Sequence, residues 1–329
     1  MTLPDIQSTT VSILSKHLRP GERVALVDFP NHANSGDSLI YLGELKYLSQ
    51  LGVVLGYVAD ASRYNVADLC RLVPEGPILI HGGGNFGDRW VAMQEMRERV
   101  IADFPDRRII QLPQGIEFSP GPVLQQAQAV LGKHKHLTLL IRDHASVTLT
   151  RKLFPKAEVE FCPDMAFGYG SITWTKRPDH DVVVVKRRDS ESATEEIPIG
   201  VDHLEEDWGL KGWRNVLAKS LRAPGALIKR IPQLGVPLYP LQRRCYDALA
   251  KMHVRNAVRI CTGGRVVVTD RLHAAVIAGL MGKPVIGINN ANGKIKAIYS
   301  DYLHQLSGVR FAPNSDAVRA VVREVLDTL

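Results

Sequence analysis

The chain has 329 residues and a mass of 36.4 kDa, which predicts two domains at about 150 residues per domain. Apolar residues make up 45% and charged residues 23%, a balance that excludes disordered and collagen-like chains. No apolar run reaches the roughly 20 residues of a membrane span, and the first residues carry no secretion signal. The four cysteines lie far apart, so we expect reduced thiols and no metal site. These features predict a soluble, cytoplasmic protein.

The N-terminal half alternates apolar runs of strand length with amphipathic stretches of helix length. We predict strands at 23–29, 53–59, 77–81, 108–112, 137–141 and 158–162. We predict helices at 38–50, 66–72, 89–103, 122–132 and 143–153. This alternation is typical of βαβ units, and therefore of a parallel sheet with helices on both faces.

A polar segment at 168–180 precedes a second series of the same kind. Its predicted strands are 181–186, 265–269 and 284–288, and its predicted helices are 241–261, 271–281, 294–306 and 315–329, the last with Ser315 as N-cap. The segment 189–240 has no clear pattern. We therefore predict an α/β protein of two Rossmann-like domains, 1–175 and 176–329, that face each other across a cleft. The last helix is a candidate to pack back on the N-terminal domain.

Ligands of such folds bind just beyond the carboxyl ends of the parallel strands. After the first strand, Asn34 and Asp37 either cap the next helix or bind sugar hydroxyls, with Asp37 as a candidate base. After the third strand, Gly83, Gly84 and Asn85 belong to the run HGGGNFGD. Successive glycines allow a close approach of a ligand and predict a nest of N–H groups. The spacings of a dinucleotide site and of a P-loop are both absent.

Further candidates follow the third, fourth and fifth strands. Asp88 and Glu117 are candidate acid or base groups. Arg142 stands at the start of a helix, where its guanidinium could bind a carboxylate or a phosphate. The alternative for Arg142 is a structural ion pair with Asp143 or Asp164.

The second half places cations at helix starts. Arg271 and His273 come directly after the strand 265–269, although cations are disfavoured at the positive end of a helix dipole. Their position predicts a bound anion. Asn290 and Lys294 lie in the polar loop after the strand 284–288, and Lys294 again stands near a helix start suited to a phosphate.

Seven segments in this order resemble the polysaccharide pyruvyltransferase family: NHANSGDSLI, HGGGNFGD, LPQGIEF, IRDHAS, CPDMAF, TDRLHAAVIAGLMGKPVIGI and NGKIKAIY. The resemblance implies two Rossmann-like domains in the GT-B arrangement. It also implies transfer of pyruvate from phosphoenolpyruvate onto two sugar hydroxyls as a cyclic ketal, with phosphoenolpyruvate as co-substrate and no cofactor. It implies that Arg142, His273 and Lys294 serve phosphoenolpyruvate binding and catalysis.

The residue inventory is compatible with that chemistry. Phosphoenolpyruvate carries a carboxylate and a phosphate, which Arg142, Arg271 and Lys294 could neutralise. We expect His273 to be the general acid and one of Asp37, Asp88 and Glu117 to be the base. The first domain would hold the sugar acceptor and the second much of the donor.

Charge is concentrated in one stretch. Residues 211–259 contain eleven Lys or Arg and one acid, Asp247. The resemblance implies acceptors that are often lipid diphosphates, so we expect this stretch to meet an anionic membrane surface at the inner face of the cytoplasmic membrane. No sequence motif of a nucleic-acid-binding domain is present, and we expect no nucleic-acid partner.

Two alternatives remain open from the sequence. A nucleotide-sugar glycosyltransferase of the same architecture would bind a UDP- or GDP-sugar at these loops. A protein that senses a phosphorylated metabolite would bind its ligand without turnover.

Overall fold

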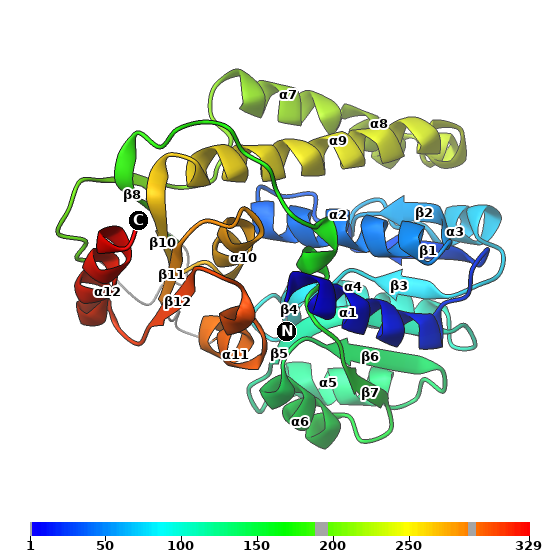
Figure 1. The fold of residues 1–329 in the computed structure, drawn as a ribbon. Coiled ribbons are helices and arrows are strands. Elements are labelled where there is room, and N and C mark those ends of the chain that lie inside the picture. Colours follow the sequence, from blue (N-terminus) through cyan, green and yellow to red (C-terminus); the bar gives the residue numbers. More distant parts are fainter. Residues whose placement is uncertain (1, 188–196, 289–293) are drawn as a thin grey trace.

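Two parallel sheets form the centre of the computed structural model, which describes residues 2–187, 197–288 and 294–329 (Figure 1). The first sheet has the order β2-β1-β3-β5-β6-β7, with β4 paired to β5, and the second has the order β12-β11-β10-β8-β9. Every recorded strand pair is parallel. This confirms the predicted α/β class and is compatible with a GT-B-like arrangement.

The first unit begins with a helix that the sequence analysis did not predict. Its elements are α1 (Leu3–His17), β1 (Arg23–Val27), α2 (Ser35–Gln50), β2 (Val54–Ala59), α3 (Val66–Leu72), β3 (Ile78–Ile80), β4 (Gly83–Gly87), α4 (Val91–Asp103), β5 (Ile109–Glu117), α5 (Pro122–Leu131), β6 (Leu137–Ile141), α6 (His144–Leu153), β7 (Glu158–Phe161) and the 3₁₀ turn η1 (Met165–Tyr169). The strands β1, β3, β5 and β6 carry apolar residues on both faces, because helices cover both sides of the sheet.

The second unit contains the unpatterned segment. Its elements are β8 (His180–Val185), β9 (His203–Glu206), α7 (Trp213–Leu221), α8 (Ala223–Arg230), η2 (Pro232–Leu234), α9 (Gly235–Cys261), β10 (Gly264–Thr269), α10 (Leu272–Leu280), β11 (Val285–Ile288), α11 (Lys294–Asp301), η3 (Leu303–Gln305), β12 (Val309–Ala312) and α12 (Ser315–Asp327). The described part of 189–240 is therefore largely regular. Helix α9 also begins earlier than predicted, because it accommodates Pro240 within its first turns.

The glycine run is a second correction. Residues Gly83–Gly87 form β4 beside β5, rather than the predicted nest. A Cβ at Gly87, whose φ is +150°, would lie 1.7 Å from the carbonyl oxygen of Glu117. Gly87 is therefore needed for β4 and β5 to approach each other.

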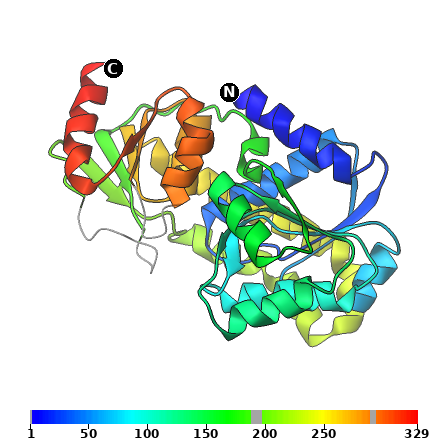
Figure 2. The same cartoon turned by 90° about the horizontal axis from the view of Figure 1, so that it is seen from below.

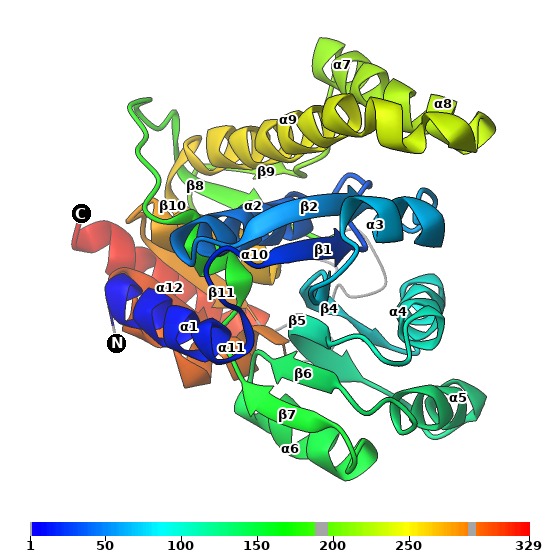
Figure 3. The same cartoon turned by 90° about the vertical axis from the view of Figure 1, so that its right-hand side faces the viewer.

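Helices α7, α8 and α9 reach back over the first unit. Figures 1 and 3 show α9 running from the second sheet across α2 and toward α3. The Tyr246 ring of α9 stacks on Phe29 at 3.9 Å, and the Tyr41 hydroxyl of α2 donates to Asp247 at 2.6 Å. One apolar cluster runs through α2, α9 and α10 and includes strands of both sheets. Helices α9 and α10 thus pack the second unit against the first.

The last helix packs on the second sheet. Val318 and Val322 of α12 join a buried cluster with Val266 and Ile286 of the sheet, and Figure 2 shows α12 at the end remote from the first unit. Within the described residues, α12 does not pack back on the N-terminal domain as the sequence suggested, because its apolar side covers β10–β12. Asn314, rather than Ser315, caps it by accepting from the Ala317 N–H at 3.0 Å.

None of the helices in the described ranges combines the length and apolar composition that crossing a membrane requires.

The contact between α9 and the first unit gives a prediction on stability. Tyr246 donates to the buried carboxylate of Asp60 at 2.7 Å, and hydrogen bonds to charged groups contribute about 1.5–3 kcal/mol. Tyr246→Phe should lower the free energy of unfolding in urea by about 2 kcal/mol. Tyr169→Phe is the control, since the Tyr169 hydroxyl has no hydrogen-bond partner among the described residues. Equal losses in both variants would contradict the assignment.

A buried ion pair below the carboxyl edge of the first sheet predicts a pH dependence. His81 Nδ1 lies 2.9 Å from Glu44 Oε2. Burial alone would lower the pKa of His81, but the Glu44 carboxylate overcomes it and raises that pKa from 6.5 to about 9. The pair therefore stabilises the fold fully below pH 6.5, and this contribution is lost as the pH rises through about 9.

We expect the free energy of unfolding to fall by a few kcal/mol, on the order of 3, between these two pH values. In urea titrations at several pH values across this range, the free energy of unfolding should fall less steeply with pH for Glu44→Gln than for the wild type. An equally steep fall of the free energy of unfolding with pH in both proteins would refute the ion-pair origin of the effect.

Candidate functional site

The two units meet where helix α10 points its first turn at the first turn of α2. A Cβ built on Gly36, the second residue of α2, would lie 2.5 Å from Nδ1 of His273. The imidazole of His273 can therefore occupy this position only because Gly36 has no side chain. His273 is the second residue of α10, and its side chain is only 12% exposed. This contact joins the carboxyl edges of the two sheets.

A shared carboxylate links His273 to Arg142. Arg142 Nη1 donates to Asp164 Oδ2 at 2.7 Å, and His273 Nε2 lies 3.3 Å from the same oxygen. Burial alone would raise the pKa of Asp164, but His273 and Arg142 together lower it below its usual range. Both Arg142 and Asp164 are almost fully buried. The predicted alternative of an Arg142–Asp164 ion pair is therefore present, and it belongs to a cluster of three residues.

Tyr302 fixes the backbone of this cluster. Its hydroxyl donates to the carbonyl oxygen of Arg142 at 3.1 Å and accepts from the N–H of Asp164 at 3.2 Å. Asp164 also accepts from the Ala166 N–H at 2.9 Å. The ion pair is thus held by groups from both units, since Tyr302 follows α11.

A cavity of about 420 Å³ opens beside Arg142. Its lining includes Gly115, Glu117 and Ser146 of the first unit and Ile298 of α11. Its size falls within the range of small-molecule sites. A larger hollow of about 630 Å³ lies elsewhere, between α7 and α9. The smaller cavity is the candidate site, because Arg142 both lines it and pairs with Asp164. Nε of Arg142 has no hydrogen-bond partner among the described residues.

Asn34 and Asp37 lie at the start of α2. Asn34 Oδ1 accepts from the Gly36 N–H at 2.9 Å, and its Nδ2 donates to Asp37 Oδ2 at 2.8 Å. Asn34 therefore acts as the helix cap, which is one of its two predicted roles. Asp37 also lies 3.4 Å from the imidazole of His32, and it follows Gly36, the residue that touches His273.

Asn85 lies in an internal polar network. Its Oδ1 accepts from Arg97 at 2.7 Å and from Gln114 at 2.8 Å, and its N–H donates to Gln114 at 3.1 Å. Arg97 is fully buried. Asn85 lies in β4 together with Gly83 and Gly84. Its hydrogen bonds to Arg97 and Gln114 hold this strand in place at the carboxyl edge of the sheet.

Asp88 and Glu117 have structural partners on the rim. Asp88 accepts from the Ser119 N–H at 2.7 Å, and Glu117 accepts from Arg89 Nε at 3.1 Å. Glu117 also lines the cavity beside Arg142. Among the three candidate bases, Glu117 lines this cavity, and Asp37 follows Gly36, the residue against which His273 packs.

Arg271 directly precedes α10, the helix that carries His273. It pairs with Asp207 at 3.0 Å and its guanidinium lies 4.9 Å from the centre of the Trp208 ring. Lys294 begins α11, but the description does not extend to its side chain, and Asn290 falls outside the described residues.

Two residues at this edge were missed as site candidates. Asp164 was considered only as a partner of Arg142, although it follows the strand 158–161 in the way the other loop residues follow theirs. Asp28, directly after β1, has a φ of +66° and is the one non-glycine residue with positive φ among those described. Burial raises its pKa, while His81 and Arg97 act in the opposite direction. Within the described ranges, no cluster of three or more His, Cys, Asp or Glu side chains could hold a metal ion.

Known proteins match the chain along most of its length. The sequence profile of the family described as polysaccharide pyruvyl transferase matches residues 34–292. Pyruvyl transferase 1 of Schizosaccharomyces pombe is 31% identical over 94% of this chain and 78% of its own length. The putative pyruvyl transferase EpsO of Bacillus subtilis is 26% identical over 87% of each chain.

A solved structure supports the fold. A functionally uncharacterised protein from Klebsiella pneumoniae superposes with a TM-score of 0.60 at 19% identity, over 93% of this chain and 97% of that one. The profile match covers the loops that carry Asn34, Arg142, Asp164 and His273. The chain therefore belongs to the polysaccharide pyruvyl transferase family, whose members are enzymes that transfer a pyruvyl group to a glycan.

Proposed function

We propose that this pyruvyl transferase takes its pyruvyl group from phosphoenolpyruvate and attaches it to two hydroxyls of one sugar, forming a cyclic ketal and releasing phosphate. The acceptor is a precursor of an exopolysaccharide or other cell-surface glycan, carried on a lipid diphosphate. The observation that carries the proposal is the cluster of Arg142, Asp164 and His273, which joins a guanidinium and an imidazole through one buried carboxylate.

Donor binding rests on the charges around that cluster. Phosphoenolpyruvate brings a carboxylate and a phosphate, and Arg142 offers an unpartnered Nε beside the cavity. The first turns of α2, α6 and α10 lie around the cluster through Gly36, Asp143 and His273, and helix N-termini favour anions. Lys294, at the start of α11, and Arg271 are the further cations in this proposal.

The proposed reaction begins with protonation of the donor. His273 gives its proton to the methylene carbon, which becomes a methyl group, and C2 becomes an electrophilic oxocarbenium centre. One sugar hydroxyl adds to C2 and releases its proton. The bond from C2 to the phosphate oxygen then breaks, and the second hydroxyl adds with loss of its own proton. Of the two hydroxyl protons released, one replaces that given by His273 and the other accompanies the phosphate.

Asp164 and Asp37 take separate parts in this scheme. Asp164 Oδ2 lies 3.3 Å from His273 Nε2 and orients the imidazole for the proton transfer. Asp37 is the proposed base because it directly follows Gly36, the residue against which His273 packs. Asn34 orients Asp37 through the hydrogen bond of 2.8 Å.

Replacing the donor-site cations should separate binding from chemistry. Phosphoenolpyruvate at about a hundred times its Kd should stabilise the wild type by about 2.7 kcal/mol in a thermal-shift titration. Arg142→Lys should lose this stabilisation, because an ammonium cannot replace the guanidinium fork. His273→Ala should lower kcat by about 10²–10⁴-fold while its melting temperature without ligand stays near that of the wild type.

The same titration tests the alternatives. UDP, GDP and inorganic phosphate serve as control ligands. Stabilisation by UDP or GDP in place of phosphoenolpyruvate would support a nucleotide-sugar glycosyltransferase, and wild-type kcat in His273→Ala would overturn the role of the imidazole.

The contact at Gly36 gives an independent test of His273. A methyl group there would occupy a position 2.5 Å from Nδ1, so the imidazole must move. A displacement of about 1 Å can lower a rate by about 10²-fold, and we expect a loss of that order in kcat for Gly36→Ala. Gly121→Ala is the matched control, because a Cβ at Gly121 would meet no atom within 4 Å. Equal activity of the two variants would contradict the proposed geometry.

A further inference from the structure

The outer face of α7, α8 and α9 combines exposed apolar side chains with exposed cations. Twelve large apolar residues are exposed in the described parts of the chain, and half of them lie between residues 213 and 241. These six are Trp213, Val216, Leu217, Leu227, Ile231 and Leu241. Scattered exposed apolar residues are ordinary, whereas a concentration on one face indicates an interaction surface.

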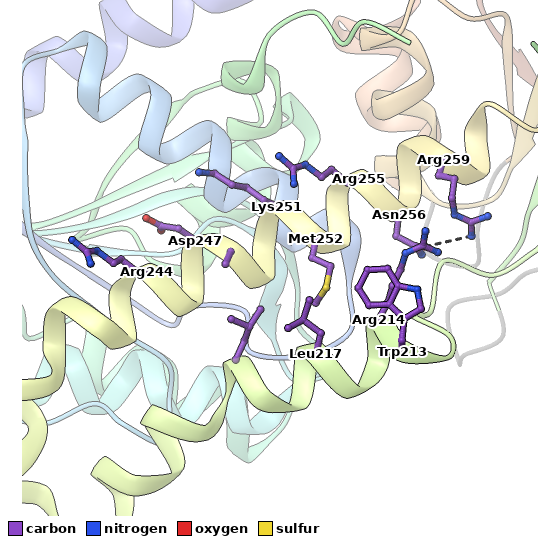
Figure 4. A pocket seen from close by; sticks show the side chains of 12 residues that line it. Trp213, Arg214, Leu217, Arg244, Asp247, Lys251, Met252, Arg255, Asn256 and Arg259 are labelled. Carbon is purple, nitrogen blue, oxygen red and sulfur yellow. Dashed lines mark hydrogen bonds between the residues drawn. The ribbon is translucent and has the colours of Figure 1, made fainter. Parts of the chain in front are cut away.

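A groove between α7 and α9 lies on this face (Figure 4). Trp213 and Leu217 of α7 face Met252 of α9 across it, and the groove holds about 630 Å³. Trp213 is 68% exposed. The interior of the groove is therefore largely apolar and open to solvent.

Cations line the groove along α9. Arg244, Lys251, Arg255 and Arg259 follow one another at intervals of seven, four and four residues, so they share one face of the helix. Arg244, Lys251 and Arg255 have no ion-pair partner within the described ranges. The acid in the groove, Asp247, is already engaged by the Tyr41 hydroxyl at 2.6 Å and by Arg243 at 3.1 Å.

We propose that this face, with the α7–α9 groove at its centre, docks the enzyme on the surface of a bilayer containing anionic phospholipids. Guanidinium groups bind lipid phosphates through paired hydrogen bonds. Indole rings favour the boundary between headgroups and acyl chains. The combination of apolar interior and cationic rim fits the charge and the amphipathic character of such a surface.

The docking face adjoins the candidate site. Asn256, which lines the groove, donates to the carbonyl oxygen of Trp208 at 3.0 Å, and Arg271 stacks on the Trp208 ring. A glycan attached to a lipid in this membrane would thus lie close to the boundary of the two units. Membrane docking does not depend on the proposed reaction, because it is measured with no substrate present.

Vesicle flotation tests the inference directly. Vesicles of phosphatidylcholine with phosphatidylglycerol should bind the wild type at low salt, whereas vesicles of phosphatidylcholine alone should not. Each base near an anionic surface strengthens binding about fivefold. The variant Arg244→Gln/Lys251→Gln/Arg255→Gln should therefore bind about 100-fold more weakly.

The control variant is Lys133→Gln/Lys135→Gln/Lys156→Gln, which loses the same number of positive charges. These exposed lysines lie in the loops after α5 and α6, and Figures 1 and 3 place α5 and α6 on the side opposite α7–α9. This variant should keep vesicle binding within about twofold of the wild type. The melting temperatures of both triple variants establish that they are folded.

The indole provides a second readout. Tryptophan emission of the wild type should shift to the blue with anionic vesicles, and Trp213→Phe should lack most of that shift. Equal binding to neutral and anionic vesicles, or equal losses in the two triple variants, would overturn the inference. Binding of single-stranded nucleic acid that depends on Arg244, Lys251 and Arg255, without vesicle binding, would also overturn it.

Discussion

The carboxylate of Asp164 is the constraint on which the candidate site depends. One oxygen accepts from Arg142 and lies next to His273, and the other accepts from the backbone of Ala166. A buried charge is tolerated only when it is paired and hydrogen-bonded. Loss of any one partner would leave a charge uncompensated inside the protein. Asp164 thereby holds the side chains of Arg142 and His273 in place, and such preorganisation is what electrostatic catalysis needs.

The fold brings these groups together by a simple topological rule. Parallel strands direct their carboxyl ends to one edge, and the residues that follow them meet there. Arg142 follows β6, Asp164 follows β7 and His273 lies in the first turn of the helix after β10. The apolar cluster through α2, α9 and α10 holds the two edges against each other. Helix α9 adds Tyr246 to this contact, so the position of the site depends on a helix far from its own chemistry.

Most of the fold could be predicted from periodicity, because buried parallel strands are short apolar runs between amphipathic helices. The strand at 137–141 and the helix at 66–72 have the predicted bounds. The glycine strand β4 could not be predicted, because glycine has no intrinsic preference for a strand. Pairing with β5 imposes the extended conformation on it. The start of α9 was also not predictable, because Pro237 and Pro240 are unusual within a helix. Contacts of Tyr239 with Tyr57 and of Gly235 with Asp68 stabilise this part of the helix.

The sequence singled out Arg142 and His273, which the structure brings to one carboxylate, but it did not reveal the contacts that connect them. Arg142 stood out because its guanidinium at a helix start could bind an anion, and His273 because a basic residue at the positive end of a helix dipole predicts one. That anion is in part Asp164, which sequence reasoning treated only as an alternative partner of Arg142. Asn34 and Asn85 were recognisable as polar loop residues, but their hydrogen bonds within the protein come from long-range packing. Pairings between residues more than a hundred positions apart, such as His273 with Asp164, cannot be read from local patterns.

Transfer of a labelled carbon tests the central claim most directly. Phosphoenolpyruvate carrying ¹³C at C2 is incubated with the enzyme and a glycan acceptor, and the product is examined by NMR. The account predicts that the label appears as a quaternary carbon bonded to two sugar oxygens, with an equimolar release of phosphate. It also predicts that both signals are lost in Asp164→Asn, because Arg142 and His273 then lack their common partner. Phosphate release without a ketal carbon, or undiminished transfer in Asp164→Asn, would contradict it.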